Sequence, residues 1–170
     1  MKSKNLARCG IMIGVLSLCG WLSFPVLGVP VTLQSFAVFF ALFRLGGKWG
    51  TAAVAGYLCL GAVGVPVFSG FGGGVGVLLG PTGGYLWGFL LGGLMYWLLT
   101  RVFGSKCSLI SSFLGLLLCY LCGTVWFSVG FGNGKDIWQT LLITVFPFFL
   151  PDVAKILLAY ALSKRLGRIF

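Results

Sequence analysis

The stretch FSGFGGGVGVLLGPTGGYLWGF, residues 68–89, is crowded with glycine and lies between two long apolar runs. Glycine reaches backbone angles that other residues avoid, so such a run can fold back tightly and present bare N–H groups to a ligand. In a bilayer, irregular backbone survives only where protein buries it or where it lines a watery cavity. We therefore expect this segment to lie at the floor or rim of a pocket.

The composition of the whole chain excludes an ordinary soluble domain. Of its 170 residues, 59% are hydrophobic and 8% are charged, and the mean hydropathy is +1.08. Soluble domains carry about 25% charged residues. Repeated apolar runs of about 20 residues are typical of helices that cross a bilayer. The sequence predicts an all-α integral membrane protein, a single transmembrane domain over residues 1–170 with six membrane-spanning helices and a glycine-rich outer segment lining a ligand pocket.

Prolines and glycines set the expected boundaries of these spans. Two prolines in residues 25–33 indicate an outer loop with extended backbone. Pro147 interrupts the apolar run 137–150, and Pro151 suits the first position of the last helix. Asp152 would then lie at the positive end of that helix dipole. The six expected spans cover residues 6–24, 34–45, 49–64, 85–103, 108–129 and 151–167.

The net charge of +10 is explained by topology rather than by nucleic-acid binding. All basic residues except Lys135 and Lys155 fall at the ends of apolar runs on one side of the expected bundle. This is the positive-inside pattern, which places both termini in the cytoplasm. Asp136 is explained as loop polarity beside Lys135. The N-terminal run lacks a convincing small-x-small cleavage site, so we expect it to remain as the first span.

Asp152 and Lys155 are the charged pair most in need of explanation. They are three residues apart on one helical face, at membrane depth, where charged groups normally pair or face a cavity. Two interpretations remain open from the residues alone, a self-contained ion pair and a ligand-recognition site. Among the aromatic residues, Tyr85 beside the glycine turn is the best candidate for a pocket wall, followed by Trp126.

Other chemistry finds little support in the sequence. The chain has no histidine and only two acidic residues, which argues against a metal site and against carboxylate-pair catalysis. GNGKD lacks the surrounding residues of a phosphate-binding loop, so the chain should not hydrolyse ATP. Cys119 and Cys122 form a C-x-x-C pair, but no helix N-terminus or cation accompanies it, so we interpret both as small packing residues.

Small residues mark one face of the first span. Gly10 and Gly14 are four residues apart, a small-xxx-small pattern that lets another helix approach closely. We expect Cys9, Ser17 and Gly20 to extend this stripe. The residues alone leave open whether the stripe packs within the chain or against a partner.

Three motifs resemble the biotin-specific substrate-binding subunit (S component) of energy-coupling-factor (ECF) transporters, the BioY family. They are VPVTLQS at residues 29–35, GVLLGPTGGYLWGF at 76–89 and PDVAK at 151–155, and together they span most of the chain. The resemblance implies a biotin-binding subunit of the cytoplasmic (inner) membrane, with no enzymatic activity and no cofactor. It also implies two kinds of protein partner, a transmembrane coupling subunit and two ATPase subunits.

The resemblance further implies roles for particular residues. Residues 29–34 would close over biotin as a lid, with Thr32 and Gln34 as hydrogen-bonding groups. Helix 1 would dock on the coupling subunit through Gly10 and Gly14. The implied substrate-binding residues are Asp152, Lys155, Tyr85, Thr82, Gly83, Gly84, Thr32, Gln34 and Trp126. Two alternatives remain, an S component for another vitamin and a membrane thiol–disulfide oxidoreductase using Cys119 and Cys122.

Overall fold

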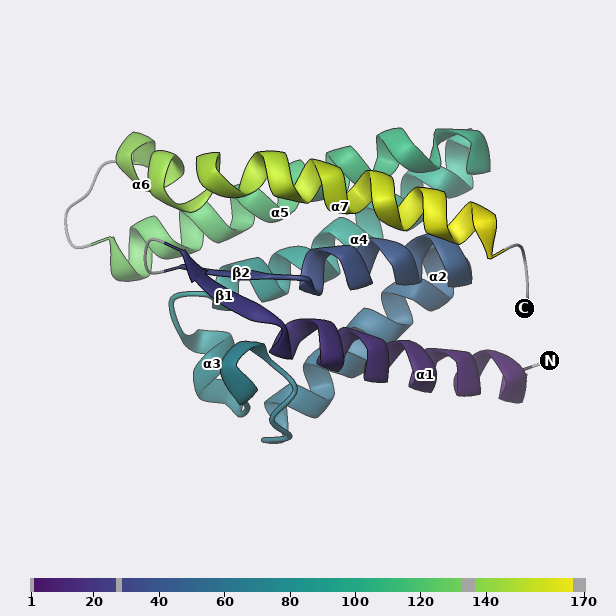
Figure 1. The fold of residues 1–170 in the computed structure, drawn as a ribbon, viewed down its shortest axis with the longest axis horizontal. Coiled ribbons are helices and arrows are strands. Elements are labelled where there is room, and N and C mark those ends of the chain that lie inside the picture. Colours follow the sequence, from purple (N-terminus) through teal and green to yellow (C-terminus); the bar gives the residue numbers. More distant parts are fainter. Residues whose placement is uncertain (1, 27–28, 133–136, 167–170) are drawn as a thin grey trace.

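A computed structural model describes residues 2–26, 29–132 and 137–166, which form helices around one short hairpin (Figure 1). The hairpin strands, β1 Ser23–Val26 and β2 Val29–Thr32, are antiparallel with Ser23 opposite Thr32. Figure 1 shows that α1 begins and α7 ends at one end of the molecule, whereas α3 and α6 lie toward the other. The helices are α1 Lys2–Trp21, α2 Gln34–Ala62, α3 Val75–Leu79, α4 Gly83–Phe103, α5 Ser108–Phe131, α6 Ile137–Thr144 and α7 Phe146–Arg165, with single 3₁₀ turns at η1 Ser69–Phe71 and η2 Ser105–Cys107.

Long apolar helices dominate the described residues, as the composition predicted. Three segments are long and apolar enough to cross a bilayer: Gly83–Phe103, Ser105–Phe131 and Phe146–Arg165. The all-helical class is confirmed, with the hairpin as an addition. The extended backbone expected near residues 25–33 corresponds to the paired strands. The number of six crossings stays a prediction.

Helix α2 consists of two helical halves that meet at Gly46. This residue has φ +76° and ψ 167°, a conformation that glycine adopts without strain and that interrupts a helix. Beyond it, Gly47 lies so close to α4 that a Cβ there would be 2.5 Å from the Cα of Trp97. The break expected between the spans 34–45 and 49–64 is therefore present, and glycine both forms it and allows it to pack.

The last helix begins earlier than the sequence suggested. Pro151 was expected at its first position, but α7 starts at Phe146 and Pro147 occupies the first turn. Pro151 lies inside the helix, one turn later. Both prolines are compatible with an early helical position, and the chain uses the first of them. Asp152 is therefore beyond the first turn, so the helix dipole is not what accounts for its position.

Glycine contacts bring α4 and α5 into close packing. A Cβ on Gly92 would lie 2.6 Å from the carbonyl oxygen of Gly115, and one on Gly88 would lie 2.9 Å from the Cα of Cys119. Small residues of this kind let helices approach in membranes, where the hydrophobic effect gives no net drive for association. This close pair forms one wall of the cavity described below.

Replacing Gly92 with alanine should destabilise the protein. The added methyl group overpacks the α4–α5 contact, so we expect a loss of about 1–3 kcal/mol in unfolding free energy. Thermal unfolding in detergent measures it. Gly14→Ala is the matched control, since nothing lies within 4 Å of a Cβ at that helical position. Equal unfolding midpoints for the two variants would contradict the packing argument.

Candidate functional site

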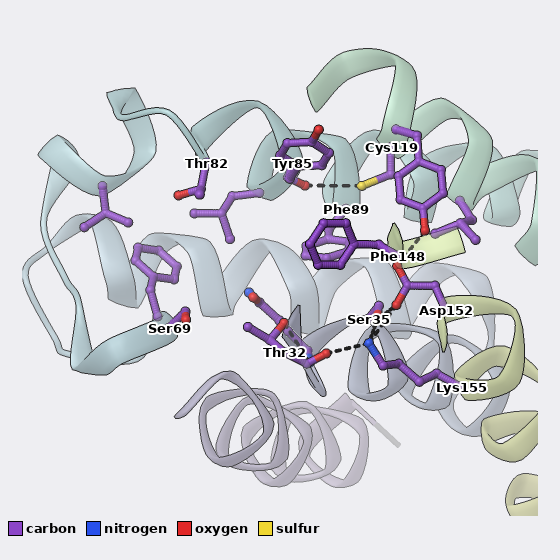
Figure 2. Close-up of a pocket in the computed structure, with 16 residues that line it drawn as sticks. Thr32, Ser35, Ser69, Thr82, Tyr85, Phe89, Cys119, Phe148, Asp152 and Lys155 are labelled. Carbon is purple, nitrogen blue, oxygen red and sulfur yellow. Dashed lines mark hydrogen bonds and ion pairs between the residues drawn. The ribbon is translucent and has the colours of Figure 1, made fainter. Parts of the chain in front are cut away.

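A cavity of about 190 Å³, here called the central cavity, lies among the end of the hairpin, the start of α2, the glycine-rich segment and helices α4, α5 and α7 (Figure 2). Asp152 and Lys155 of α7 contribute its charged groups, and Phe68, Phe89 and Phe148 contribute apolar surface. The lining residues are Thr32, Gln34, Ser35, Phe68, Ser69, Val77, Thr82, Tyr85, Leu86, Phe89, Leu116, Cys119, Tyr120, Phe148, Asp152 and Lys155.

Asp152 and Lys155 form a buried ion pair in the wall of this cavity. The Lys155 Nζ lies 2.7 Å from Asp152 Oδ1, and the two side chains are only 12% and 10% exposed, respectively. Both point toward the region of Ser35 and Thr32 in Figure 2. The two residues therefore form an ion pair, as the first interpretation predicted, and they also line a cavity, as a ligand-recognition site would require. The remaining acidic residue, Asp136, lies outside the described residues, as does Lys135.

Ser35 and Tyr120 complete the coordination of the carboxylate. The Ser35 hydroxyl donates to Asp152 Oδ1 at 2.8 Å, and the Tyr120 hydroxyl donates to Oδ2 at 2.7 Å. Sequence reasoning missed both residues. Ser35 was within reach because it belongs to the VPVTLQS motif, but Tyr120 lies on α5 and carries no local signal linking it to α7. Three donors from three helices therefore hold Asp152 in one position.

Lys155 connects this cluster to the hairpin. Its ammonium group donates to the backbone carbonyl of Thr32 at 2.7 Å and to Ser35 Oγ at 3.4 Å, in addition to the carboxylate. Thr32 is the last residue of β2, and only Leu33 separates it from α2. One lysine thus joins α7 to the end of the hairpin and to the first turn of α2.

Gln34 is buried and hydrogen-bonded within the protein, although it also lines the cavity. Its Nε2 donates to the Tyr57 hydroxyl at 2.9 Å, and that hydroxyl donates to the carbonyl of Val67 at 3.0 Å. Val67 immediately precedes the glycine-rich segment. The chain of bonds therefore ties the start of α2 to the start of that segment.

Indole groups bind the backbone of the irregular region. Trp21 Nε1 donates to the carbonyl of Pro66 at 2.7 Å, Trp87 Nε1 to Leu78 at 3.3 Å and Trp126 Nε1 to Gly80 at 3.0 Å. The bonds from Trp21 and Trp87 supply donors to the carbonyls of Pro66 and Leu78, whereas the carbonyl of Gly80 also accepts from the Gly83 N–H at 2.9 Å. The glycine-rich segment lines the cavity with side chains, and none of its glycines is a lining residue. The lining residues from this segment are Phe68, Ser69, Val77, Thr82, Tyr85, Leu86 and Phe89.

Three predicted site residues lie behind the wall rather than in it. Gly83, Gly84 and Trp126 do not line the cavity, which corrects the expectation that glycine N–H groups face a ligand. A Cβ on Gly84 would collide with the Trp126 side chain, and one on Gly83 would collide with the carbonyl of Leu78. These glycines have a packing role, since they let α4 begin directly against α3 and α5. Trp126 also has a structural role, since its Nε1 donates to the carbonyl of Gly80.

Tyr85 lies where the sequence placed it, in the cavity wall at the glycine turn (Figure 2). Its ring packs so closely on Gly123 of α5 that no Cβ could be accommodated there. Gly123 is a residue that sequence reasoning did not single out. Its lack of a side chain gives the aromatic ring of Tyr85 room to pack against α5.

The two cysteines of the C-x-x-C pair lie within α5 and are not joined by a disulfide. Cys119 is buried, and its Sγ donates to the carbonyl of Tyr85 at 3.4 Å. A thiol in this position fits a small packing group. Within the described residues, no group of histidine, cysteine and acidic side chains could hold a metal ion.

Gly10 and Gly14 lie on the exposed face of α1, and nothing lies within 4 Å of a Cβ built on either. The interpretation in which they pack within the chain is therefore wrong. Cys9, Ser17 and Gly20 were expected on the same stripe but face inward. Cys9 Sγ donates to the carbonyl of Trp49, and a Cβ on Gly20 would be 3.0 Å from the carbonyl oxygen of Val67.

These features define a class, a helical membrane protein that encloses a solute-sized cavity with one buried ion pair in its wall. The chain belongs to the BioY family, whose family model matches residues 1–170. A solved structure with the same fold is the S component for biotin from an ECF-type ABC transporter. It superposes with a TM-score of 0.88 at 27% identity, covering 99% of this chain and 93% of that one.

Two relatives match over nearly their whole length. The chain is 40% identical to the biotin transporter BioY of Thermotoga maritima over 167 residues, which is 98% of this chain and 97% of that protein. It is 35% identical to the probable biotin transporter BioY of Pyrococcus horikoshii, covering 98% of each.

Removing one partner of the ion pair should destabilise the protein strongly. Asp152→Asn removes the carboxylate charge and leaves a buried ammonium group, so we expect a loss of about 3–5 kcal/mol in unfolding free energy. Denaturant unfolding in detergent measures it. Adding Lys155→Met to Asp152→Asn should recover part of the loss, because no charge is then stranded. A double variant no more stable than the single one would contradict this account, and Lys106→Met, at an exposed position, serves as the control.

Proposed function

We propose that this protein is the biotin-binding S component of an ECF-type vitamin uptake transporter. The observation that carries the proposal is the buried Asp152–Lys155 pair, set in the wall of an otherwise largely apolar cavity in a chain that matches the BioY family from end to end. The family consists of transporters, so the chain is not an enzyme, and the oxidoreductase alternative is not favoured.

The chemistry of biotin suits both the charged and the apolar residues that line the central cavity. Biotin has a ureido ring with two N–H donors and one carbonyl, and an apolar tail that ends in a carboxylate. A carboxylate can only accept hydrogen bonds, so Asp152 suits the ureido N–H groups, whereas Lys155 suits the ureido carbonyl or the tail carboxylate. Apolar parts of the ligand would contact Phe89 and Phe148.

The coordination of the pair limits how a ligand can enter it. Asp152 already accepts three hydrogen bonds, and an ionised carboxylate has about four acceptor sites. One ligand N–H can therefore be added without displacing a protein donor. On Lys155, the 3.4 Å contact with Ser35 is the longest, so a ligand oxygen would replace that contact first.

Binding of labelled biotin to the purified chain tests the proposal. We expect saturable binding that unlabelled biotin displaces and that thiamine, as a vitamin of different chemistry, does not. Asp152→Asn and Lys155→Ala should each weaken binding more than about a hundredfold, because each strands one buried charge. Gly123→Ala should weaken it by displacing the Tyr85 ring, with Gly130→Ala as the control on the same helix.

Two results of this experiment would overturn parts of the proposal. An absence of biotin binding by the folded parent protein would exclude the function. Parent-like affinity in Asp152→Asn would make the pair structural. A separate comparison of biotin with biotin methyl ester, both binding to the parent protein, locates Lys155. A much weaker affinity for the ester places Lys155 at the tail carboxylate, and a similar affinity places it at the ureido ring.

The hairpin and the start of α2 act as a lid in this proposal. What supports the role is that Lys155 holds the Thr32 carbonyl and that Gln34 lies in the cavity wall. Gln34→Ala breaks the bond to Tyr57 and should speed biotin release. If biotin dissociates from the variant at the same rate as from the parent, the hairpin is a connecting segment and does not act as a lid.

The exposed glycines of α1 support docking on a transmembrane coupling subunit, which would in turn join two ATPase subunits. A flat glycine surface lets a partner helix approach closely. The double variant Gly10→Leu with Gly14→Leu should no longer co-purify with the coupling subunit, while biotin binding is kept. Gly130→Leu, at another open glycine, is the control. Retained co-purification of the double variant would refute this docking face.

The proposed topology has six crossings in the inner membrane, with both termini in the cytoplasm. The crossings are α1, the two halves of α2, α4, α5 and α7. Support comes from the common end at which α1 begins and α7 ends, and from the basic residues that gather there. A C-terminal reporter enzyme active only in the periplasm should stay inactive, and activity would contradict the topology.

A further inference from the structure

A second cavity, here called the basic cavity, has lining residues from the start of α1 and the end of α7. Figure 1 shows that these two helix ends lie at the same end of the molecule. Its volume is about 730 Å³. Every charged side chain that lines it is basic: Arg8, Arg44 and Lys164. It shares no lining residue with the central cavity.

The three cations converge from separate helices. Arg8 lies on α1, Arg44 precedes the Gly46 break in α2, and Lys164 lies in the last turn of α7. The positive-inside rule accounts for the number of basic residues at this end, since it acts through the flanks of each span separately. It does not require side chains distant in sequence to line one cavity.

Contacts within the protein hold these side chains around the cavity. Arg44 donates to the carbonyl of Ser163 at 3.4 Å, and Arg8 donates to Asn5 Oδ1 at the same distance. The Lys164 Nζ lies 4.5 Å from the centre of the Tyr160 ring. Both arginines are half-buried. The two arginines are therefore held by their neighbours, whereas Lys164 is exposed and lies beside the Tyr160 ring.

The remaining lining suits a phosphate group with attached carbon. Ser105 and Ser108 line the cavity, and Ser108 is also the first residue of α5, where the helix dipole favours an anion. Guanidinium forks match the oxygens of a phosphate group. Trp49 and Tyr96 add aromatic surface.

We infer that the basic cavity binds a phosphate-bearing anion through Arg8, Arg44 and Lys164. The same chemistry fits the head group of an anionic phospholipid and free phosphate, and the two sources can be separated by experiment. The site is distinct from the central cavity, so the inference holds whichever solute that cavity takes.

Native mass spectrometry of the full chain in neutral detergent tests this, with phosphatidylglycerol and phosphatidylcholine as probes. We expect phosphatidylglycerol to bind at least about tenfold more tightly than phosphatidylcholine. A cation near a lipid surface contributes about fivefold in affinity, so Arg8→Gln with Arg44→Gln should weaken phosphatidylglycerol binding about twentyfold. Lys164→Gln, at an exposed position, should weaken it about fivefold and guards against misfolding of the double variant.

The matched control is Arg101→Gln with Lys106→Gln, which removes equal charge from exposed positions outside the cavity lining. Its affinity should stay within about twofold of the parent. Competition by inorganic phosphate would identify the free anion as sufficient, and no competition together with the loss in the double variant would identify the lipid. Equal losses in the control and the double variant, or no loss in the double variant and Lys164→Gln, would overturn the inference.

Discussion

The carboxylate of Asp152 is the point on which the arrangement of the central cavity depends. It accepts hydrogen bonds from Ser35 on α2, Tyr120 on α5 and Lys155 on α7, and Lys155 in turn holds the end of the hairpin. A charge at this depth is costly unless it is paired and hydrogen-bonded. The same bonds that make the charge tolerable also fix three helices and one hairpin relative to one another. If the cluster binds biotin as proposed, recognition and architecture share one set of contacts.

A second constraint comes from the irregular backbone between α2 and α4. Backbone bonds inside the segment pair some of its carbonyl groups, as the Gly83 N–H does with the carbonyl of Gly80. Indole and phenol groups from α1, α2, α4 and α5 donate in addition to the carbonyls of Pro66, Val67, Leu78 and Gly80. Glycine then serves mainly to let these elements approach, as at Gly84 and Gly123. The position of this part of the cavity wall therefore depends on hydrogen bonds from neighbouring helices as well as on the sequence of the segment itself.

Much of the fold could be predicted because apolar runs and punctuating residues act locally. The helices over 83–103 and 108–131 follow from uninterrupted apolar sequence, and the break at Gly46 follows from a glycine pair between basic residues. The start of α7 could not be predicted, since Pro147 and Pro151 both suit an early helical position. Of the site, Asp152 and Lys155 were predictable because charge is rare in such a chain. Tyr120 was not, because its place beside Asp152 depends on how α5 and α7 are rotated against each other.

The tryptophan bonds also give the protein an internal optical label. Trp21, Trp87 and Trp126 each hold a carbonyl within residues 66–80, so movement of that segment would break or lengthen an indole hydrogen bond. Indole fluorescence responds to such changes in polarity and hydrogen bonding. Trp138, largely exposed on α6, makes no such contact among the described residues. A movement of residues 66–80 would therefore change the emission of three of the six tryptophans in the unmodified chain.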